Sequence, residues 1–334
     1  MDVFLKNKKN SFWVILILVI MGLAFIATPK AQAITLIPPT LELGLTPGQT
    51  ANTVIKLFNE TPDMVQLFTE ARNFTAKNDT GQPDFDFNAE PLGLSTWMEV
   101  EAGPIIIASG ERYEVPVTIN PPDNADPGGH YAALFFTSAA PEEGQVKVAS
   151  KIGTLILANV EGDVQEAGNI SEFIVDDDQS MFNRLPVGFT ARFQNTGNIH
   201  LKPVGAIEIK NIFGSITDTL EFNASKGATL PKTTRKYEVI WEKGIINATG
   251  ENFWSDFWQE YKNERSNFAF GKYTAVVSIT AGTNDSVTDT AEIGFWVLPW
   301  RVILVWSLVI IIGIILVIWL FKRYNAWIIK KAKK

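Results

Sequence analysis

Two kinds of hydrophobic pattern divide the sequence: continuous apolar runs near both ends, and short alternating runs between them. Between residues 34 and 297, apolar and polar positions alternate over short segments separated by Pro-Gly, Asn-Asp and Pro-Pro pairs. Alternation with a period of two is typical of strands, and no long segment of residues 34–162 keeps a helical period. The clearest strands of the first half are Asn52–Phe58, Tyr113–Ile119 and Tyr131–Phe136. Many short strands without helices between them predict an all-β protein built of β-sandwiches.

The same pattern continues after a change in the sequence near Asp163. The predicted strands of this second half are Ser171–Val175, Val187–Gln194, Val204–Ile209, Tyr237–Trp241, Tyr273–Ala281 and Thr288–Trp296. At about 100–200 residues per domain, a chain of 334 residues has room for two such domains. The sequence therefore predicts two tandem sandwiches, over residues 34–162 and 163–297, rather than one large barrel.

The N-terminal apolar run has the layout of a secretory signal peptide. Lysines precede an apolar run over residues 12–26, and Ala31 and Ala33 are the small residues that a signal peptidase requires. The predicted signal peptide covers residues 1–33, and cleavage leaves Ile34 as the first mature residue. An uncleaved anchor fits less well, because the apolar run is short for a membrane span.

The C-terminal apolar run has the length of a transmembrane helix. Val302–Leu320 contains only one serine and one glycine among apolar residues, and at about 1.5 Å per residue it nearly crosses a hydrocarbon core of about 30 Å. Trp300 and Tyr324 flank it, as interfacial aromatic residues do. Six cations and no acid follow this run. The positive-inside rule therefore predicts a transmembrane helix over residues 298–321, a basic cytoplasmic tail over 322–334 and an ectodomain outside the cell membrane.

Charge and cysteine content narrow the range of functions. Of the 36 acidic residues, 35 lie between Ile34 and Val297, together with only 18 of the 29 basic residues. Such an acidic surface repels phosphate backbones, which argues against nucleic-acid binding. The chain has no cysteine, so packed cores must stabilise it without disulfides. For an exported protein, this favours a bacterial cell envelope.

The order of motifs in the first half is more specific than its periodicity. A Leu45–Gly48 turn, a segment around Trp97, a turn at Gly110 and the segment Asp126–Tyr131 follow one another, and residues 148–164 close the block. This succession resembles the N-terminal domain of the WxL-interacting proteins of Gram-positive bacteria and, more distantly, the immunoglobulin-like domain of pilus chaperones. In the WxL-interacting family, the first domain is associated with peptidoglycan binding and the second with host or partner binding.

The second half also resembles a domain of that family. Residues 193–214 look like an immunoglobulin-like hairpin whose turn is Asn195–Asn198. The pattern departs from the family at residues 246–267, where an aromatic and charged stretch is inserted, with one short helix expected near 250–262. The resemblance implies two tandem immunoglobulin-like β-sandwich domains.

Few residues are candidates for catalysis or metal binding. His130 and His200 are the two histidines, and neither a nucleophile elbow nor a His-Glu-x-x-His motif accompanies them. Glu99 and Glu101 alternate on one predicted strand, where two exposed acids are commoner than a glycosidase pair. Asp176–Asp178 is more simply a solvated loop than a calcium site, because it lacks the spacing of an EF-hand. We therefore predict no enzyme activity, no cofactor and no bound metal.

The inserted stretch carries the strongest candidate for a binding element. Its five aromatic residues have helical spacing and would share one broad face of a helix: Phe253, Trp254, Phe257, Trp258 and Tyr261. Two interpretations stay open. Either this face packs on the sandwich, which is the commoner case, or it is exposed and contacts a partner protein, a glycan or the outer membrane leaflet.

Together these features predict a non-catalytic, single-pass membrane protein of the cell surface. We expect an adhesion or envelope scaffold module that binds cell-wall glycan or another surface protein. One alternative is a membrane-anchored chaperone or assembly factor for secreted subunits, which requires an unpaired edge strand with a basic residue, for which Arg112 is a weak candidate. A less favoured alternative is an envelope glycan hydrolase, which requires two close acids in a pocket.

Overall fold

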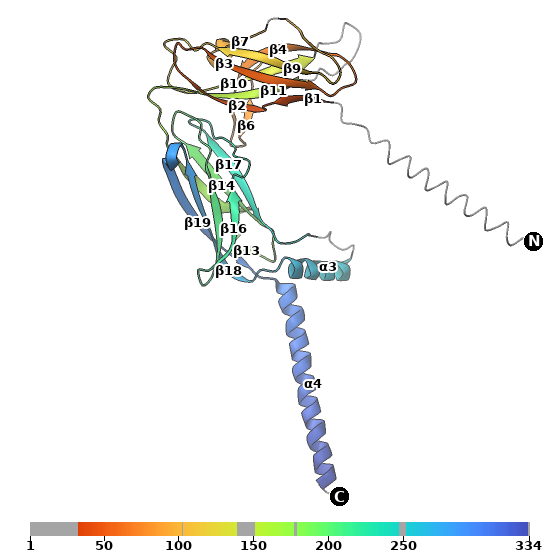
Figure 1. Ribbon diagram of the computed structural model, residues 1–334. Helices are drawn as coiled ribbons and strands as arrows, with labels where there is room; N and C mark the ends of the chain where they lie inside the picture. Colours follow the sequence, from red (N-terminus) through yellow and green to blue (C-terminus); the bar gives the residue numbers. More distant parts are fainter. Residues whose placement is uncertain (1–32, 102, 139–150, 177–178, 247–251, 333–334) are drawn as a thin grey trace, which may run out of the picture.

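Two β-sandwiches follow one another along the chain, each around its own buried core, and a long helix extends from the second (Figure 1). The computed structural model describes residues 33–101, 103–138, 151–176, 179–246 and 252–332. The predicted signal peptide, with Ala31, lies outside the described residues, apart from Ala33 at their start.

The first sandwich consists of a four-stranded and a five-stranded sheet. Its strands are β1 (Ile34–Ile37), β2 (Thr40–Leu45), β3 (Ala51–Asn59), β4 (Val65–Asn73), β7 (Met98–Val100), β8 (Ile105–Ile107), β9 (Arg112–Ile119), β10 (Gly128–Ser138) and β11 (Lys151–Val160). The strand orders are β1-β3-β9-β7 and β2-β11-β10-β4-β8, and β2 runs parallel to β11. Along β9, Val115, Val117 and Ile119 are buried while their neighbours are not, which is the alternation that predicted the strand.

The second sandwich has a three-stranded sheet of order β12-β14-β17 and a five-stranded sheet of order β13-β19-β18-β15-β16. These strands are β12 (Gly168–Val175), β13 (Met181–Phe182), β14 (Val187–Asn195), β15 (Val204–Asn211), β16 (Ile216–Phe222), β17 (Thr234–Trp241), β18 (Gly271–Ala281) and β19 (Val287–Val297). Trp241, Phe193 and Phe295 are fully buried between the sheets. The predicted all-β fold of two tandem immunoglobulin-like β-sandwiches is confirmed.

The path from β14 to β15 differs from the prediction. Residues 193–214 do not form a hairpin, because β14 pairs with β12 and β17, whereas β15 pairs with β16 and β18. The buried side chain of Asn195 donates to the carbonyl oxygens of Ile199 at 2.7 Å and Thr229 at 2.9 Å, and so stabilises a crossover between the sheets. Alternation alone does not distinguish a crossover from a hairpin, since both join two half-buried strands.

Three helices and a small hairpin complete the described structure. They are β5 (Thr75–Lys77) with β6 (Gln82–Asp84), α2 (Leu94–Trp97), α3 (Phe253–Ser266) and α4 (Trp300–Ala332), besides a short 3-10 turn at Thr283–Asp285. Within α4, residues 300–329 are long and apolar enough to cross a membrane. The direction in which α4 crosses stays a prediction.

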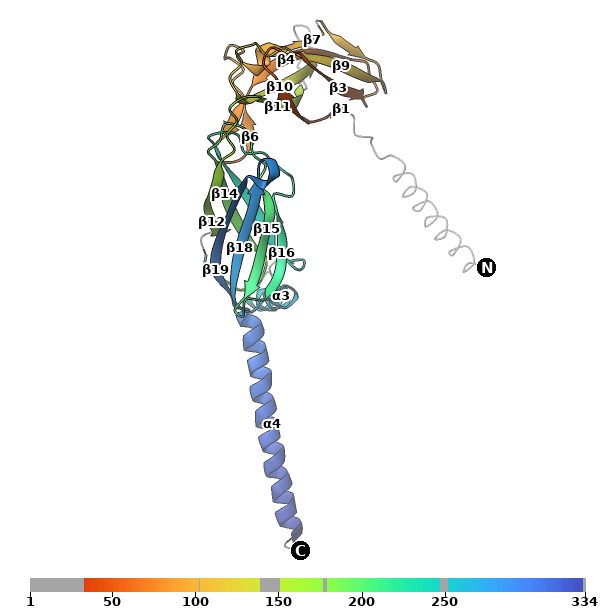
Figure 2. The same ribbon diagram turned by 60° about the vertical axis from the view of Figure 1, so that its left-hand side comes forward.

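The parts are arranged in an angular shape. In Figures 1 and 2, the strands of the first sandwich run crosswise to those of the second, and β6 lies in the angle between them. At the opposite end of the second sandwich, α3 lies across the upper end of α4 (Figure 1). The molecule therefore has two joints, one between the sandwiches and one between the second sandwich and α4.

Candidate functional site

The predicted aromatic helix is present as α3, and its first turn explains where it begins. The side-chain oxygen of Asn252 accepts a hydrogen bond from the Ser255 backbone N–H at 3.0 Å, and the Ser255 hydroxyl accepts one from the Asn252 N–H at 3.1 Å. This reciprocal capping box satisfies two backbone donors at the helix start. Aromatic residues have only moderate helix propensity, so the cap contributes to fixing the boundary.

Most of the aromatic surface of α3 is exposed. Three of the side chains are exposed, namely Phe253 (74%), Trp254 (68%) and Trp258 (48%). The other two, Phe257 and Tyr261, are half-buried. The buried face of the helix is polar instead and includes Asn263 and Glu264. The structure thus favours the interpretation of an exposed aromatic face, and what this face contacts stays a prediction.

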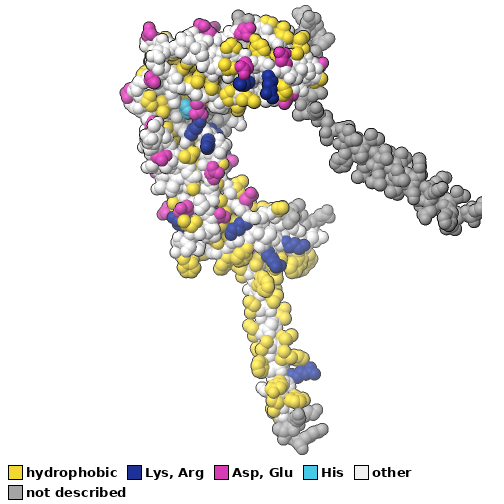
Figure 3. Space-filling view, in the orientation of Figure 1, with side chains coloured by type: hydrophobic (Ala, Val, Ile, Leu, Met, Phe, Trp, Pro, Cys, Tyr) yellow, Lys and Arg dark blue, Asp and Glu magenta, His cyan; other side chains and the backbone are white. Residues whose placement is uncertain are grey.

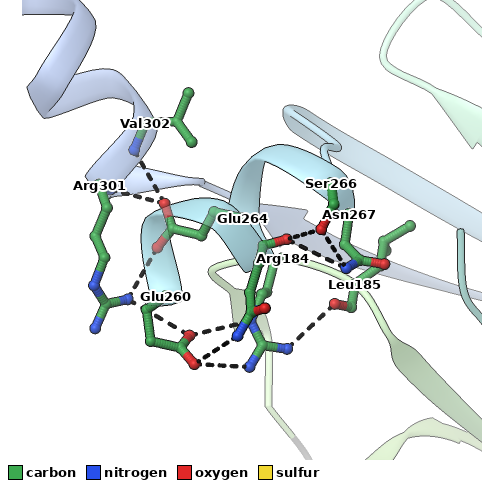
Figure 4. Close-up of polar contacts among 9 residues, drawn as sticks. Arg184, Leu185, Glu260, Glu264, Ser266, Asn267, Arg301 and Val302 are labelled. Carbon is green, nitrogen blue, oxygen red and sulfur yellow. Dashed lines mark hydrogen bonds and ion pairs between the residues drawn. The ribbon is translucent and has the colours of Figure 1, made fainter. Parts of the chain in front are cut away.

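The polar face of α3 holds the beginning of α4 (Figure 4). The fully buried carboxylate of Glu264 accepts hydrogen bonds from the backbone N–H groups of Arg301 at 2.9 Å and Val302 at 3.1 Å, and from Arg301 Nη1 at 3.0 Å. The first N–H groups of a helix have no partner within it and carry partial positive charge. Glu264 therefore caps α4 and joins it to α3.

A second carboxylate, Glu260, links this junction to the sandwich. Arg184 Nε donates to Glu260 at 3.2 Å, and Arg184 Nη1 donates to the carbonyl oxygen of Leu185 at 3.3 Å (Figure 4). Burial acts to raise the pKa of Glu260, but hydrogen bonds from Arg184 and Asn263 and the charges of Arg184 and Arg301 outweigh it, so this pKa lies below its ordinary value. The carboxylate is therefore ionised at neutral pH.

The last residue of the junction, Asn267, fixes the end of α3 to the second sandwich. Its side-chain oxygen accepts from the Gly244 N–H at 2.8 Å, and its backbone carbonyl accepts from the Leu185 N–H at 3.3 Å. The rings of Phe257 and Trp300 lie 6.2 Å apart across the junction. The sandwich, α3 and the start of α4 therefore form one packed unit.

A second candidate site, which the sequence did not indicate, is a cleft of about 330 Å³ between the two sandwiches. Strands β2 and β11 and the β5–β6 hairpin supply one wall, and residues 225–235 supply much of the other. Its larger apolar side chains are Phe74, Pro83, Leu155, Leu157 and Leu230, and its basic side chains are Lys202, Lys226 and Arg235. Pockets of this size commonly bind ligands.

Arg235 is a half-buried cation of the cleft. Its Nη1 donates to the carbonyl oxygen of Ala228 at 2.7 Å, and its guanidinium lies 5.2 Å from the centre of the Tyr237 ring. Its buried Nε has no hydrogen-bond partner among the described residues. Gly81, at φ +71°, allows the hairpin to come this close, because a Cβ there would lie 2.2 Å from Arg235 Nε. An unpaired buried donor costs about 1–3 kcal/mol.

Polar contacts join the two sandwiches at more than one place. At the turn of the β5–β6 hairpin, Arg192 forms an ion pair with Asp79 at 3.0 Å, and the Lys236 backbone N–H donates to the Asp79 carbonyl oxygen at 2.7 Å. Elsewhere along the joint, the Gly129 N–H donates to the carbonyl oxygen of Asn198 at 2.8 Å. The angle between the sandwiches therefore rests on specific bonds.

His200 belongs to this joint. Its Nδ1 lies 3.4 Å from the Tyr131 hydroxyl, and the two rings meet edge to face. Burial lowers the pKa of His200, although the nearby Glu42 carboxylate opposes this effect, and Lys202 lowers the pKa further. Burial also raises the pKa of Tyr131. The imidazole is therefore neutral at pH 7 and fills the joint.

Two other sequence candidates lie apart from both sites. The His130 ring contacts that of Trp97 at 4.7 Å, and its Nε2 lies 2.8 Å from the carbonyl oxygen of Asp126. Arg112 lies at the start of β9, with its guanidinium 5.2 Å from the Phe58 ring. Arg112 is not among the residues that line the cleft, and its role in the chaperone alternative stays a prediction.

The acidic candidates are not gathered into a metal or catalytic site. Glu99 lies in β7, and Glu101 accepts a hydrogen bond from the Tyr113 hydroxyl at 2.8 Å. Of the acidic run, Asp176 accepts from Thr190, and the next two aspartates lie outside the described residues. Within the part of the chain that the structure describes, no group of three or more His, Asp or Glu residues could hold a metal ion.

Among the comparisons with known proteins, similarity was found to solved structures and not to family models or curated sequences. No protein-family model matches the chain, and no curated protein matches it. The chain is similar to CfaA, a chaperone of class 5 fimbriae, with 10% identity and a TM-score of 0.37 over 80% of this chain and 100% of that one. It is also similar to the E. coli chaperone DraB, with 7% identity and a TM-score of 0.35 over 79% and 97% of the two chains.

A further similarity is to the CsuC–CsuE chaperone–tip adhesion subunit complex of Acinetobacter baumannii, with 9% identity and a TM-score of 0.36 over 78% of this chain and 97% of that one. These scores are too low to carry an argument about function, and the fold class rests on the chain's own sheets. None of these matches identifies the WxL-interacting family, so that resemblance stays a prediction. A glycoside hydrolase from Clostridium perfringens matches over only 36% of this chain, with a TM-score of 0.26.

Proposed function

We propose that this chain is a membrane-anchored, non-catalytic surface protein that holds a segment of another surface or secreted protein between its two sandwiches. This proposal takes up the partner-binding form of the predicted function and is nearest to the chaperone or assembly-factor alternative. The observation that carries it is a cleft that both sandwiches line, with the cation Arg235 in its wall.

The chemistry of the cleft favours an extended polypeptide with an apolar and an acidic side chain. Leu155 and Leu157 offer an apolar wall, and Arg235 lines the same cleft as a cation for which a carboxylate or carbonyl oxygen would be the matching acceptor. β2 is the edge strand of its sheet, and its Thr40 and Glu42 line the cleft. An edge strand can pair with an added strand, which would supply main-chain hydrogen bonds to the bound segment.

The other predicted activities receive less support from this cleft. Phe74 is the one aromatic residue among its lining residues, and it is buried, so no exposed ring is offered to a sugar. Glu42 is the one carboxylate in that lining, whereas a glycosidase needs a pair. Peptidoglycan binding and glycan hydrolysis are therefore the less supported hypotheses.

Site-specific photo-crosslinking in native membranes tests the proposal. A photoreactive amino acid at Ser225, in the wall of the cleft, is expected to capture one exported protein through a defined segment. The matched control position is Glu114, which is exposed on β9 in the other sheet of the first sandwich. The same protein captured equally at both positions, or no protein captured at Ser225, would contradict the proposal.

A charge-removing variant sharpens this experiment. Arg235→Gln is expected to lower the crosslinking yield at Ser225 about tenfold or more, because a hydrogen bond to a charged group contributes about 1.5–3 kcal/mol. Lys56→Gln, which removes an exposed cation on the first sandwich, is the control for net charge.

Purified peptidoglycan is incubated with the same full-length variants. Retention that depends on Arg235 would favour glycan binding instead.

A further inference from the structure

The exposed aromatic face of α3 has a fixed position relative to α4. Glu264 binds two backbone N–H groups in the first turn of α4, so α3 cannot turn away without uncapping that helix. If α4 crosses a bilayer, its apolar stretch from Val302 onward lies in the hydrocarbon region. The first turn of α4, and α3 with it, then lies at the level of the lipid headgroups.

Other exposed apolar side chains lie at the same end of the second sandwich. Asn211, at the end of β15, pairs with Tyr273 near the start of β18, and Gly271 pairs with Val297 next to α4. The hairpin tip that follows Asn211 therefore points toward the membrane end, and its Phe213 is 88% exposed. The apolar side chains gathered there are Ile212, Phe213, Phe268 and Phe270, besides the three of α3. Figure 3 shows hydrophobic side chains gathered along the lower edge of the second sandwich and α3.

The composition of α3 matches that of helices that lie in a membrane surface. Large aromatic residues occupy one side, the exposed cation Arg265 lies among them, and the exposed Lys262 follows next around the helix. Tryptophan is favoured at the headgroup level, and lysine and arginine there are attracted to anionic lipids. A water-exposed patch of this kind is unusual for a protein that lacks a partner there.

We propose that α3 lies in the plane of the bilayer that α4 crosses, with Phe253, Trp254 and Trp258 inserted at the headgroup–acyl boundary. The tip around Phe213 makes a second contact with the same leaflet. Two contacts beside the spanning helix hold the second sandwich upright on the membrane and limit its tilt. This inference concerns a surface separate from the cleft and does not depend on the function proposed above.

The absence of native cysteine permits a direct depth measurement on the full-length protein. Spin labels are attached at Trp254→Cys or Gln259→Cys in nanodiscs of phosphatidylcholine and phosphatidylglycerol holding one copy each. These positions lie on different sides of α3, since five residues turn a helix by about 140°. The label at position 254 is expected to be accessible to oxygen and protected from an aqueous nickel complex, with the reverse at 259. Equal nickel accessibility at both positions would overturn the proposal.

Two further measurements distinguish the lipid from other occupants. With Phe253→Ser and Trp258→Ser added, the label at 254 is expected to become accessible to nickel, while a label at Ile312→Cys in α4 stays protected. A label at 254 that stays protected in this variant overturns lipid contact through the aromatic face. Protection at 254 that appears only in discs holding two copies would assign the surface to a second copy of the chain and likewise overturn the proposal.

Discussion

The two joints of the molecule are built from different chemistry. At the joint between the second sandwich and α4, Glu264 is fully buried and every bond it makes is to the start of α4. At the joint between the sandwiches, the ion pair of Arg192 and Asp79 leaves about a third of each side chain in solvent, 33% and 35%. We call the first the dry joint, because its carboxylate is fully buried, and the second the wet joint, because its ion pair is partly exposed to solvent.

This difference in burial decides how each joint responds to change. A buried carboxylate that loses its partners keeps the full cost of desolvation, so such a joint is stable only when complete. Exposed ion pairs contribute little and are screened by salt. We therefore expect α3 and α4 to move as one body, and the angle across the cleft to adjust when a partner binds.

The largest expected effect comes from breaking the dry joint. Glu264→Ala removes the cap of α4 and leaves Arg301 without its buried partner, so the free energy of unfolding is expected to fall by about 3–5 kcal/mol. Denaturant unfolding of the full-length protein in detergent micelles measures this loss. Glu264→Gln keeps an acceptor oxygen and is expected to lose less. An alanine variant as stable as the original protein would contradict the contrast between the joints.

An intermediate effect is expected at the wet joint when pH falls. Because the pKa of His200 lies below its ordinary value of 6.5 in the folded joint, the separated state binds more protons as pH falls below 6.5. The joint is therefore most stable above pH 6.5 and loses stability below it, until the pKa of His200 in the folded state is passed. Spin-label distances between the sandwiches are expected to broaden from about pH 7.5 to about pH 5.

Other titratable groups lie near the His200 imidazole, so this measurement needs a control variant. Tyr131, Glu42 and Lys202 surround it. In His200→Gln the change with pH is expected to vanish if the imidazole is its cause. Broadening of the same size in that variant would assign the effect to another group.

The smallest expected effect is at the exposed ion pair. Asp79→Asn removes the charge that faces Arg192, and the free energy of unfolding is expected to fall by at most about 1 kcal/mol. The difference from the original protein is expected to disappear near 1 M salt, where the screening length is about 3 Å. Glu114→Gln, which breaks the exposed pair with Lys56, is the matched control away from the joint. A loss that persists in high salt would show that this joint is drier than its exposure indicates.

The strands were predictable because their cause is local. In β9 and β18, every second side chain is buried, and this period is visible in the sequence without knowledge of the partner strands. The crossover after β14 was not predictable in this way, because the bonds of Asn195 reach residues as distant as Thr229. Likewise, Arg235 lies near the start of β17, and its side chain meets Gly81 of the other sandwich.

By itself, the sequence determined the all-β class, the spanning length of the last helix and the aromatic side of α3, since each depends on the order of apolar and polar residues along a few turns or strands. Only the tertiary structure decided that much of this aromatic side is exposed, because α3 packs instead through its polar face, where Glu264 binds the start of α4. It also decided where the cleft lies, since walls from residues such as Leu157 and Lys226 meet only when both sandwiches are folded and joined. Contacts between distant parts of the chain leave no periodic pattern in the sequence.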